Sequence, residues 1–281
     1  CARTILVNED KFREPAHMNF ELFKKIIDEA TEIGTFSVNL NLLNEPLTNP
    51  ELVKMIKYAK MKGIVDVHFH SHGGLLTEKK SLELIDSGLD KLLVSIDSSK
   101  KESYEKLRVL SKFDSVISNL ARFKEIRDSR KSLHPLIKCL FIEFPGITQE
   151  EIQENLEFGL KLADCVGFQE YIDPTNTIGE KKEYERDYQS SFACQQPFTR
   201  LSIAEDGTVS PCCLDHEFDL SVGNVKTKSI TDLWKSKEME IIRDKQKNGK
   251  FFEIPRCRNC QMATDADEGI PTQFETYGPT I

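Results

Sequence analysis

The strongest constraint on the fold is a regular alternation of helical and extended segments between residues 20 and 172. Apolar residues recur at helical spacing over 20–33, and Gly34 follows them as a helix-ending residue. Apolar runs then predict buried strands at 36–43, 65–70, 92–96, 136–142 and 166–172, with a helix after each of the first four. Strands joined in this way form right-handed crossovers. The sequence therefore predicts an α/β fold with a parallel sheet, open or rolled into a barrel.

Polar residues follow the predicted strands at their carboxyl ends, which is where parallel α/β folds place their functional groups. The five predicted ends are 44–46, 71–74, 97–99, 143–145 and 173–174.

The pattern changes after residue 172. Residues 173–193 are charged and contain Pro and Gly, which predicts a linker between a first domain at 1–172 and a second at 194–262. Within the second domain, Asp206-Gly207 lies between extended segments at 198–203 and 208–211, a strong hairpin signal. A single helix is expected over 229–248, around Trp234. The acidic tail, 263–281, is expected to be mobile, although such tails can also cover an active site.

Composition excludes several classes of function. The 281 residues carry a formal net charge of −8, which argues against bulk binding of nucleic acid. No run of about 18 apolar residues is present, so no membrane span is expected. No signal peptide opens the chain, so we expect a cytoplasmic protein.

Eight cysteines are unevenly distributed, and five of them lie in the last 90 residues. They are Cys1, Cys139, Cys165, Cys194, Cys212, Cys213, Cys257 and Cys260. Without a secretory signal a disulfide framework is the weaker interpretation, although sequence upstream of Cys1 could have carried one. Clustered thiolates suit soft metals, so a metal or iron–sulfur site is favoured.

Four of these cysteines can meet at one point. Cys194 and Cys212 flank the predicted hairpin, whose two strands lie side by side. Cys257 and Cys260 have the spacing at which two thiolates bind one metal centre. Four thiolates are enough for a tetrahedral zinc ion or for a 4Fe–4S cluster, and spacing alone leaves both open.

The order of these elements resembles the SPASM extension of radical SAM enzymes, or its shorter "twitch" form. The matching elements are Cys194-x12-Gly207-x4-Cys212, Gly223-Asn224-Val225, a helix containing Trp234, and Cys257-x2-Cys260. The resemblance implies an auxiliary 4Fe–4S cluster with Cys194, Cys212, Cys257 and Cys260 as ligands. No cysteine follows Cys260, so it implies one such cluster. Cys213 is left over as a buried thiol, an alternative ligand or a hydrogen-atom donor, and is a weak catalytic candidate.

The first domain is similar to the radical SAM core, a TIM-barrel-like partial (β/α)6 barrel. Cys1-Ala2-Arg3-Thr4 resembles the third cysteine of the family's Cys-x3-Cys-x2-Cys motif, and residues 17–23 match the segment after it. The resemblance implies that Cys1 is a ligand of the 4Fe–4S cluster that binds S-adenosylmethionine (SAM). The barrel's first strand and two further cysteines are then expected upstream of residue 1, so the chain is expected to be truncated at its N-terminus.

The resemblance also implies a set of SAM-binding residues at the strand ends. Glu45 would supply the carboxylate for the ammonium group of SAM, and Asn44 departs from the family's usual glycine. Ser95 and Asp97, which share a face by strand periodicity, would line the ribose, and Lys138 could face the SAM carboxylate. The full expected set is Asn44, Glu45, Pro46, Ser71, Ser95, Asp97 and Lys138.

Three histidines, His68, His70 and His72, alternate along one predicted strand and so share a face. A His-x-His pair on a barrel strand is also typical of metal hydrolases, but that interpretation needs further ligands on later strands. The histidines are expected either to line the substrate cavity or to fill the barrel interior.

The implied activity is reductive cleavage of SAM to a 5′-deoxyadenosyl radical, followed by hydrogen abstraction. The expected outcome is oxidation or epimerisation of a small polar molecule, such as a sugar or aminocyclitol, or modification of a peptide. An electron donor such as flavodoxin or ferredoxin is an expected partner. The alternative is a non-catalytic barrel protein that binds an iron–sulfur cluster or zinc and has lost the catalytic cluster.

Overall fold

The computed structural model describes residues 16–172, 192–258, 260–263 and 275–278. The chain divides into two compact units. We call residues 34–171 with 273–281 the sheet unit, and residues 1–33 with 172–272 the cysteine unit. Among the described residues, no helix combines the length and apolar character needed to cross a membrane.

The sheet unit contains a six-stranded sheet in the order β1-β2-β3-β4-β5-β9. Its first five strands are parallel. They are β1 (Ser37–Asn39), β2 (Asp66–Ser71), β3 (Lys91–Ser95), β4 (Leu136–Glu143) and β5 (Cys165–Glu170). Each lies within about two residues of a predicted strand except β1, which is much shorter than the predicted 36–43. The predicted parallel α/β sheet is confirmed.

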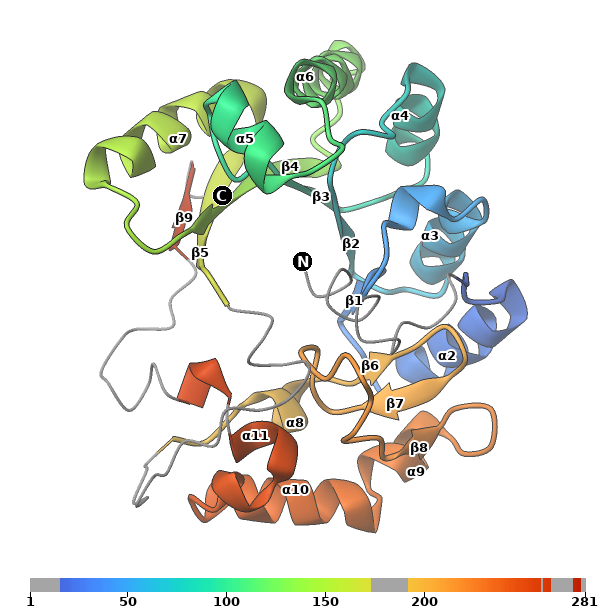
Figure 1. Ribbon diagram of the computed structural model, residues 1–281. Helices are drawn as coiled ribbons and strands as arrows, with labels where there is room; N and C mark the ends of the chain where they lie inside the picture. The colour runs from blue at the N-terminus through green and yellow to red at the C-terminus, as the bar shows by residue number, and fades with distance from the viewer. Residues whose placement is uncertain (1–15, 173–191, 259, 264–274, 279–281) are drawn as a thin grey trace. The chain divides into compact units, whose positions relative to one another are not determined.

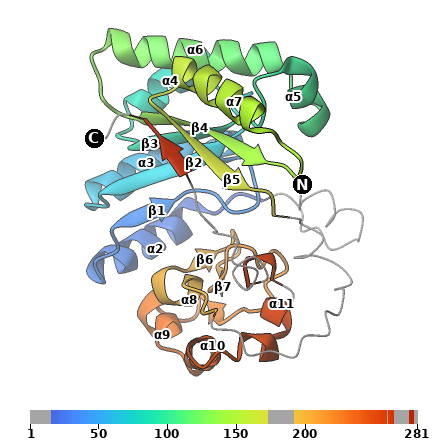
Figure 2. The same cartoon turned by 90° about the vertical axis from the view of Figure 1, so that its left-hand side faces the viewer.

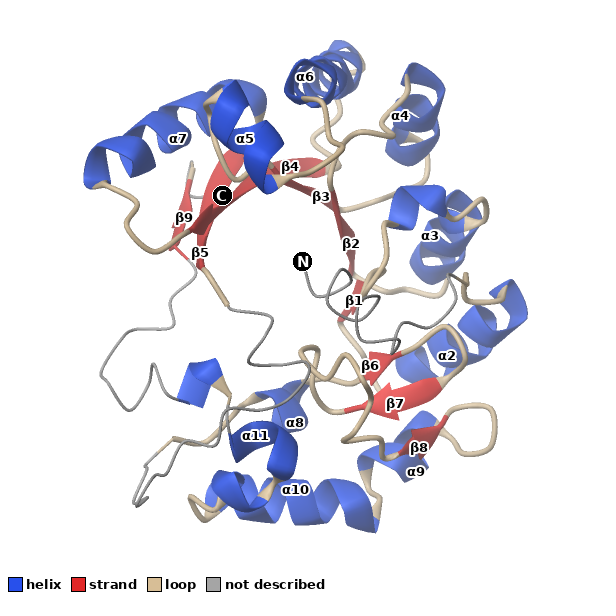
Figure 3. Ribbon diagram, viewed as in Figure 1, coloured by secondary structure: helices blue, strands red, loops and turns tan. Residues whose placement is uncertain are grey.

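Helices cover the outer side of this curved sheet (Figures 1 and 3). They are α3 (Leu52–Met61), α4 (Glu78–Ile85), α5 (Lys101–Leu107), α6 (Phe113–Ser129) and α7 (Gln149–Leu162). A capping box of Thr148 and Glu151 begins α7. A Cβ added at Gly159 of α7 would lie 2.6 Å from Val166 Cγ2 and 3.0 Å from Phe141 Cε2, so a side chain there would force these neighbours to shift. These buried strand residues therefore face the helices and form the core.

The inner face of the sheet carries polar side chains on β2 and β4. Along β2, Val67 and Phe69 are fully buried, whereas Asp66, His68 and His70 alternate with them and are half-buried. On β4, the side chain of Lys138 lies against Gly167 of β5, where an added Cβ would be 2.4 Å from Lys138 Cε. The alternation along these strands thus separates a buried apolar outer face from an inner face that carries polar groups.

Part of the tail that we expected to be mobile forms an edge strand. β9 (Glu275–Tyr277) pairs antiparallel with β5, and Figure 2 shows it running alongside that strand. The ring of Tyr277 packs edge-on against Phe168 at a centroid distance of 5.9 Å. This strand has three residues and no apolar periodicity, so the sequence pattern could not reveal it.

The cysteine unit contains a small three-stranded sheet surrounded by short helices. Its strands are β6 (Ser202–Ile203), β7 (Thr208–Ser210) and β8 (Gly223–Asn224), in that order. Its helical segments are α2 (Phe20–Glu32), α8 (Gln196–Thr199), α9 (Ile230–Trp234), α10 (Lys237–Lys247), η3 (Phe251–Glu253) and α11 (Pro255–Arg258). Val209, Val225, Leu233 and Met239 lie at the centre of its hydrophobic core.

Helix α2 packs into that core although it is far away in sequence. Ala30 of α2 belongs to the core, and Glu29 Oε2 accepts a hydrogen bond of 2.8 Å from the backbone N–H of Ile230. Ile230 begins α9, so Glu29 satisfies a backbone donor at that helix terminus.

Two expectations for this unit were wrong in detail. Residues 198–203 do not form one strand, because Pro197 supports a helical turn, α8, which ends at Thr199. Residues 229–248 form two helices rather than one. Ser236 interrupts the run and caps α10 by accepting a hydrogen bond from the N–H of Met239.

Candidate active site and cluster cavity

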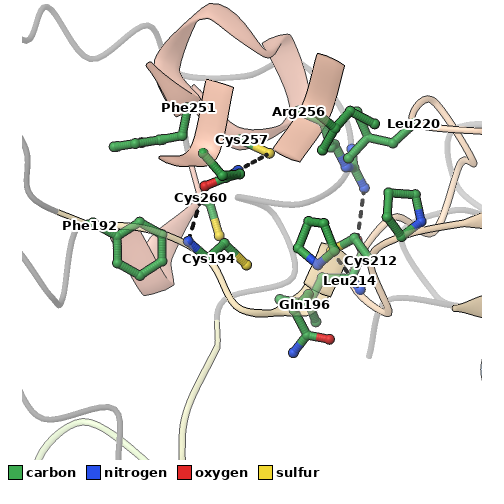
Figure 4. Close-up of a pocket in the computed structure, with 14 residues that line it drawn as sticks. Phe192, Cys194, Gln196, Cys212, Leu214, Leu220, Phe251, Arg256, Cys257 and Cys260 are labelled. Atoms are coloured by element: carbon green, nitrogen blue, oxygen red, sulfur yellow. Dashed lines mark hydrogen bonds between the residues drawn. The ribbon is translucent and has the colours of Figure 1, made fainter. Parts of the chain in front are cut away.

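Four thiols line one cavity in the cysteine unit: Cys194, Cys212, Cys257 and Cys260 (Figure 4). Most of the other lining side chains are apolar, with Gln196, Gln246 and Arg256 as the polar exceptions. Within the described residues, no three His, Cys, Asp or Glu side chains form a group that could hold a single metal ion. The four thiols thus surround a shared cavity, but no three of them form a group that could hold one metal ion.

Different elements bring each thiol to the cavity. Cys194 precedes α8, and Cys212 follows β7 after the hairpin. The hairpin turns at Gly207, whose φ of 89° lies in the left-handed region that favours glycine. Cys257 lies in α11, and the N–H of Cys260 donates to its carbonyl oxygen at 3.1 Å. The Cys-x2-Cys spacing thus spans one turn of chain.

Two buried polar side chains tie these segments together. Gln246 of α10 accepts a hydrogen bond from the N–H of Cys194 at 3.1 Å and donates to Cys257 Sγ at 3.6 Å. Arg256 donates to the carbonyl oxygen of Leu214 and pairs with Glu217, both in the segment after Cys212. Sequence reasoning missed both residues, because neither belongs to a motif.

Burial dominates the electrostatics of the thiols. It raises the pKa of Cys212 to about 12, and it also raises the pKa values of Cys194 and Cys257. Neighbouring thiols raise each of these pKa values further, because adjacent thiolates repel one another. These three thiols are therefore protonated at neutral pH, and metal binding must release their protons.

Cys213 is not among the residues that line the cavity. Its sulfur lies 3.9 Å from Oε1 of Gln196, and burial raises the pKa of its thiol.

In the sheet unit, Glu45 and Ser71 meet at the carboxyl end of β2. Ser71 Oγ donates to Glu45 Oε1 at 2.9 Å, and the N–H of Leu47 donates to the same oxygen at 3.1 Å. The N–H of His72 donates to Oε2 at 2.9 Å. Pro46 is buried in the short helix η1 (Pro46–Thr48), whereas Asn44 is exposed.

Ser95 and Asp97 do not continue one alternating face. The N–H groups of Ile96 and Asp97 both donate to the carbonyl oxygen of Leu140, and Asp97 has a φ of 61°. This bulge at the end of β3 breaks the strand period. The Asp97 side chain, only 5% exposed, forms an ion pair with Arg108 at 2.6 Å. Arg108 was missed by sequence reasoning, although a buried carboxylate needs such a partner.

Lys138 and the histidines have different partners. Lys138 Nζ donates to Thr276 Oγ1 at 2.6 Å, and burial lowers the pKa of the amine. Burial also lowers the pKa of His70 to about 4. His68 lies 3.2 Å from Asp66, whereas His72 lies 3.5 Å from Glu45. Cys1, the expected ligand of the SAM-binding cluster, lies outside the described residues.

Comparison with known proteins places these observations in a family. Residues 1–159, more than half of the chain, match the radical SAM superfamily. The chain belongs to the radical SAM superfamily. Residues 194–261 of this radical SAM protein match the SPASM family, described as an iron–sulfur cluster-binding domain. The predicted family is thereby confirmed, and the two domains imply 4Fe–4S clusters together with SAM.

Two relatives in sequence illustrate the range of the family. A tungsten-containing aldehyde ferredoxin oxidoreductase cofactor-modifying protein of Pyrococcus furiosus is 20% identical, over 94% of this chain and 85% of its own length. A Methanococcus maripaludis protein named "Probable GTP 3′,8-cyclase" is 28% identical, over 74% of this chain and 78% of its own.

Solved structures share the fold. BtrN, in complex with AdoMet and 2-DOIA, aligns over 88% of this chain and 82% of its own with a TM-score of 0.56 and 16% identity. Streptococcus suis SuiB bound to S-adenosylmethionine aligns over 89% and 66%, with a TM-score of 0.65 and 15% identity. At identities this low, the comparison shows that the radical SAM protein shares their fold and nothing more.

Proposed function

We propose that this radical SAM enzyme oxidises a small polar molecule by hydrogen abstraction and holds one auxiliary 4Fe–4S cluster on Cys194, Cys212, Cys257 and Cys260. The observation that carries the proposal is the cavity lined by all four thiols. Four sulfur donors with a largely apolar lining fit an iron–sulfur cluster. A zinc ion would instead need four sulfurs about 2.3 Å from one point.

When bound, the cofactors supply a 5′-deoxyadenosyl radical from SAM that abstracts a substrate hydrogen atom, and an auxiliary cluster that can accept the substrate radical's electron. The protein's own contribution is to hold and orient these groups. The four thiols lose their protons on binding the cluster, and Cys1 is proposed as a ligand of the SAM-binding cluster. An electron donor such as flavodoxin or ferredoxin would supply the electron for cleavage.

Glu45 is proposed to hold the ammonium group of SAM. A carboxylate offers about four acceptor positions. Ser71, Leu47 and His72 occupy three of them, two on Oε1 and one on Oε2. The fourth position, on Oε2, is left for the ammonium group, and the ring nitrogen Nε2 of His72 lies 3.5 Å from the same oxygen. Ser95 is proposed to line the ribose and Lys138 to face the carboxylate, whereas Asp97 is paired with Arg108 and is left out of this set.

A polar substrate is supported by the inner face of the sheet, where Asp66, His68, His70 and Lys138 alternate with buried apolar residues. The shared fold with BtrN, which was solved with AdoMet and 2-DOIA, supports a small molecule. SuiB has also been solved with a precursor peptide, so a peptide is the competing substrate class.

The test uses the full-length protein, reconstituted anaerobically with iron and sulfide. We expect about eight irons per chain, as two 4Fe–4S clusters require, and release of 5′-deoxyadenosine on reduction with SAM. Cys212→Ala should retain about half the iron, whereas the matched variant Cys213→Ala should retain all of it. A colourless zinc protein that leaves SAM intact would contradict the proposal.

The outcome of the reaction is tested with the same Cys213→Ala variant. Oxidation predicts unchanged turnover, because no thiol has to return a hydrogen atom. Epimerisation through Cys213 predicts that 5′-deoxyadenosine still forms while the epimerised product is lost. Deuterated polyols and deuterated peptides then distinguish the substrate classes by transfer of deuterium into 5′-deoxyadenosine.

A further inference from the structure

Gln246 is a buried amide at a position where the pattern of its helix calls for an apolar residue. Along α10, Met239 and Ile242 precede it at spacings of seven and four residues on the face that packs inward. Gln246 is 1% exposed. A buried amide is costly unless its donor and acceptor are both satisfied.

Both ends of this amide are engaged at the cluster cavity. Oε1 accepts a hydrogen bond of 3.1 Å from the backbone N–H of Cys194, and Nε2 donates to Cys257 Sγ at 3.6 Å. One side chain therefore connects two of the three segments that carry the thiols. It does so from a helix that contributes no thiol of its own.

We infer that Gln246 is a positioning residue of the auxiliary cluster, fixing Cys194 and Cys257 and raising the cluster's reduction potential through its N–H···S hydrogen bond. The inference rests on the proposed function, because it takes these cysteines as ligands.

The physical reason is charge on sulfur. A hydrogen bond to a ligating thiolate stabilises negative charge, and the reduced cluster carries one more negative charge than the oxidised one. The bond therefore favours the reduced form, and hydrogen bonds to the sulfurs are a recognised determinant of cluster potential. A cluster that takes up an electron from a substrate radical benefits from this direction of shift.

Two other polar groups at the cavity act differently. The N–H of Leu214 donates to Cys212 Sγ at 3.4 Å, but it belongs to the backbone and cannot be removed by substitution of a side chain. Arg256 directs its guanidinium to Glu217 and to the carbonyl oxygen of Leu214. Gln246 is thus the side chain through which the contact to sulfur can be tested.

Two variants separate the functions of the amide. Gln246→Glu keeps an oxygen that can accept from Cys194 but replaces the donor to Cys257 with a second oxygen. Gln246→Leu removes both bonds. Glu240→Gln, at an exposed position of the same helix, is the matched control. The midpoint potential is measured in reconstituted holoprotein by redox titration of the EPR signal that does not change when SAM is added.

We expect a lower midpoint potential in both Gln246 variants and faster loss of iron to a chelator, with the largest iron loss in Gln246→Leu. Glu240→Gln should match the unaltered protein. Fluorescence of the single tryptophan, Trp234, reports whether this unit is folded in each variant. An unchanged midpoint potential in folded Gln246→Glu would overturn the inference. If Gln246→Leu fails to fold, the near-isosteric Gln246→Glu variant alone tests the inference.

Cys257→Ala separates this inference from the proposed function. If that variant keeps the auxiliary signal, the proposed ligand set is wrong. If it loses the signal while both Gln246 variants keep the original potential and iron, only the role of Gln246 is wrong.

Discussion

The guanidinium Nε of Arg256 lies 3.6 Å from Oδ1 of Asp215, and the two side chains are only 5% and 0% exposed. Asp215 also accepts hydrogen bonds from Ser210 Oγ and from the backbone N–H groups of Asp219 and Leu220. Arg256 immediately precedes Cys257, and Asp215 follows Cys212 by three residues. This buried pair therefore holds two of the proposed ligand segments together before any metal binds.

Arg256→Met is predicted to lower the free energy of unfolding of the cysteine unit by about 3 kcal/mol, because it leaves Asp215 buried without its counter-charge. Urea unfolding followed by Trp234 fluorescence measures the change. Arg258→Met is the matched control, since Arg258 is exposed on the same helix. Equal losses in the two variants would show that the buried pair contributes nothing specific.

Glu45→Gln is predicted to weaken SAM binding about 10- to 100-fold, because a charge-assisted hydrogen bond contributes about 1.5–3 kcal/mol. Equilibrium binding to reconstituted protein measures the affinity. Glu51→Gln, which changes a carboxylate paired with the exposed Lys54, should bind SAM normally. Unchanged affinity in Glu45→Gln would remove Glu45 from the SAM site.

Arg108→Gln is predicted to destabilise the protein more at about pH 7 than at about pH 4. Burial raises the pKa of Asp97 above its ordinary value, and Arg108 partly opposes this. Between the unfolded and folded pKa values the folded state binds more protons, so stability falls as pH rises through that window. Removing Arg108 raises the folded pKa further and enlarges this fall.

Circular dichroism in urea at the two pH values gives the free energies of unfolding for that comparison. In an Asp97→Asn background the cost of Arg108→Gln should be the same at both pH values. A pH-dependent cost that persists in this background would assign the effect to another group.

Gly167→Ala is predicted to cost about 1–3 kcal/mol of stability by overpacking. Its Cβ would lie 2.4 Å from Lys138 Cε and 3.0 Å from Leu140 Cδ2, and displacing Lys138 would strain its bond to Thr276. Lys138→Ala should therefore rescue part of the loss in the double variant. Thermal unfolding of the four proteins in this cycle measures the coupling, and strictly additive costs would contradict the predicted contact.

The sequence alone predicted the parallel α/β sheet and the family. Apolar periodicity reports which face of a segment is buried, so β2 and β4 could be placed to within about two residues. The order of Cys194, Gly207, Cys212, Cys257 and Cys260 carried the resemblance to SPASM. These features are local or depend on order along the chain, which a sequence displays directly.

Only the tertiary structure revealed the partners of the site. Arg108 lies eleven residues after Asp97, and Arg256 lies 41 residues after Asp215, and no pattern links either pair. The bulge that turns Asp97 off the face of Ser95 depends on the carbonyl oxygen of Leu140 in a neighbouring strand.

Gln246 shows the same limit most clearly. By periodicity its position belongs to the apolar face of α10, and only the neighbouring Cys194 N–H and Cys257 sulfur explain an amide there. A buried polar group needs hydrogen-bond partners, and here these partners come from distant segments that meet only when the chain folds. The sequence therefore determined the sheet and the set of thiols, whereas the folded structure determined which side chains hold them.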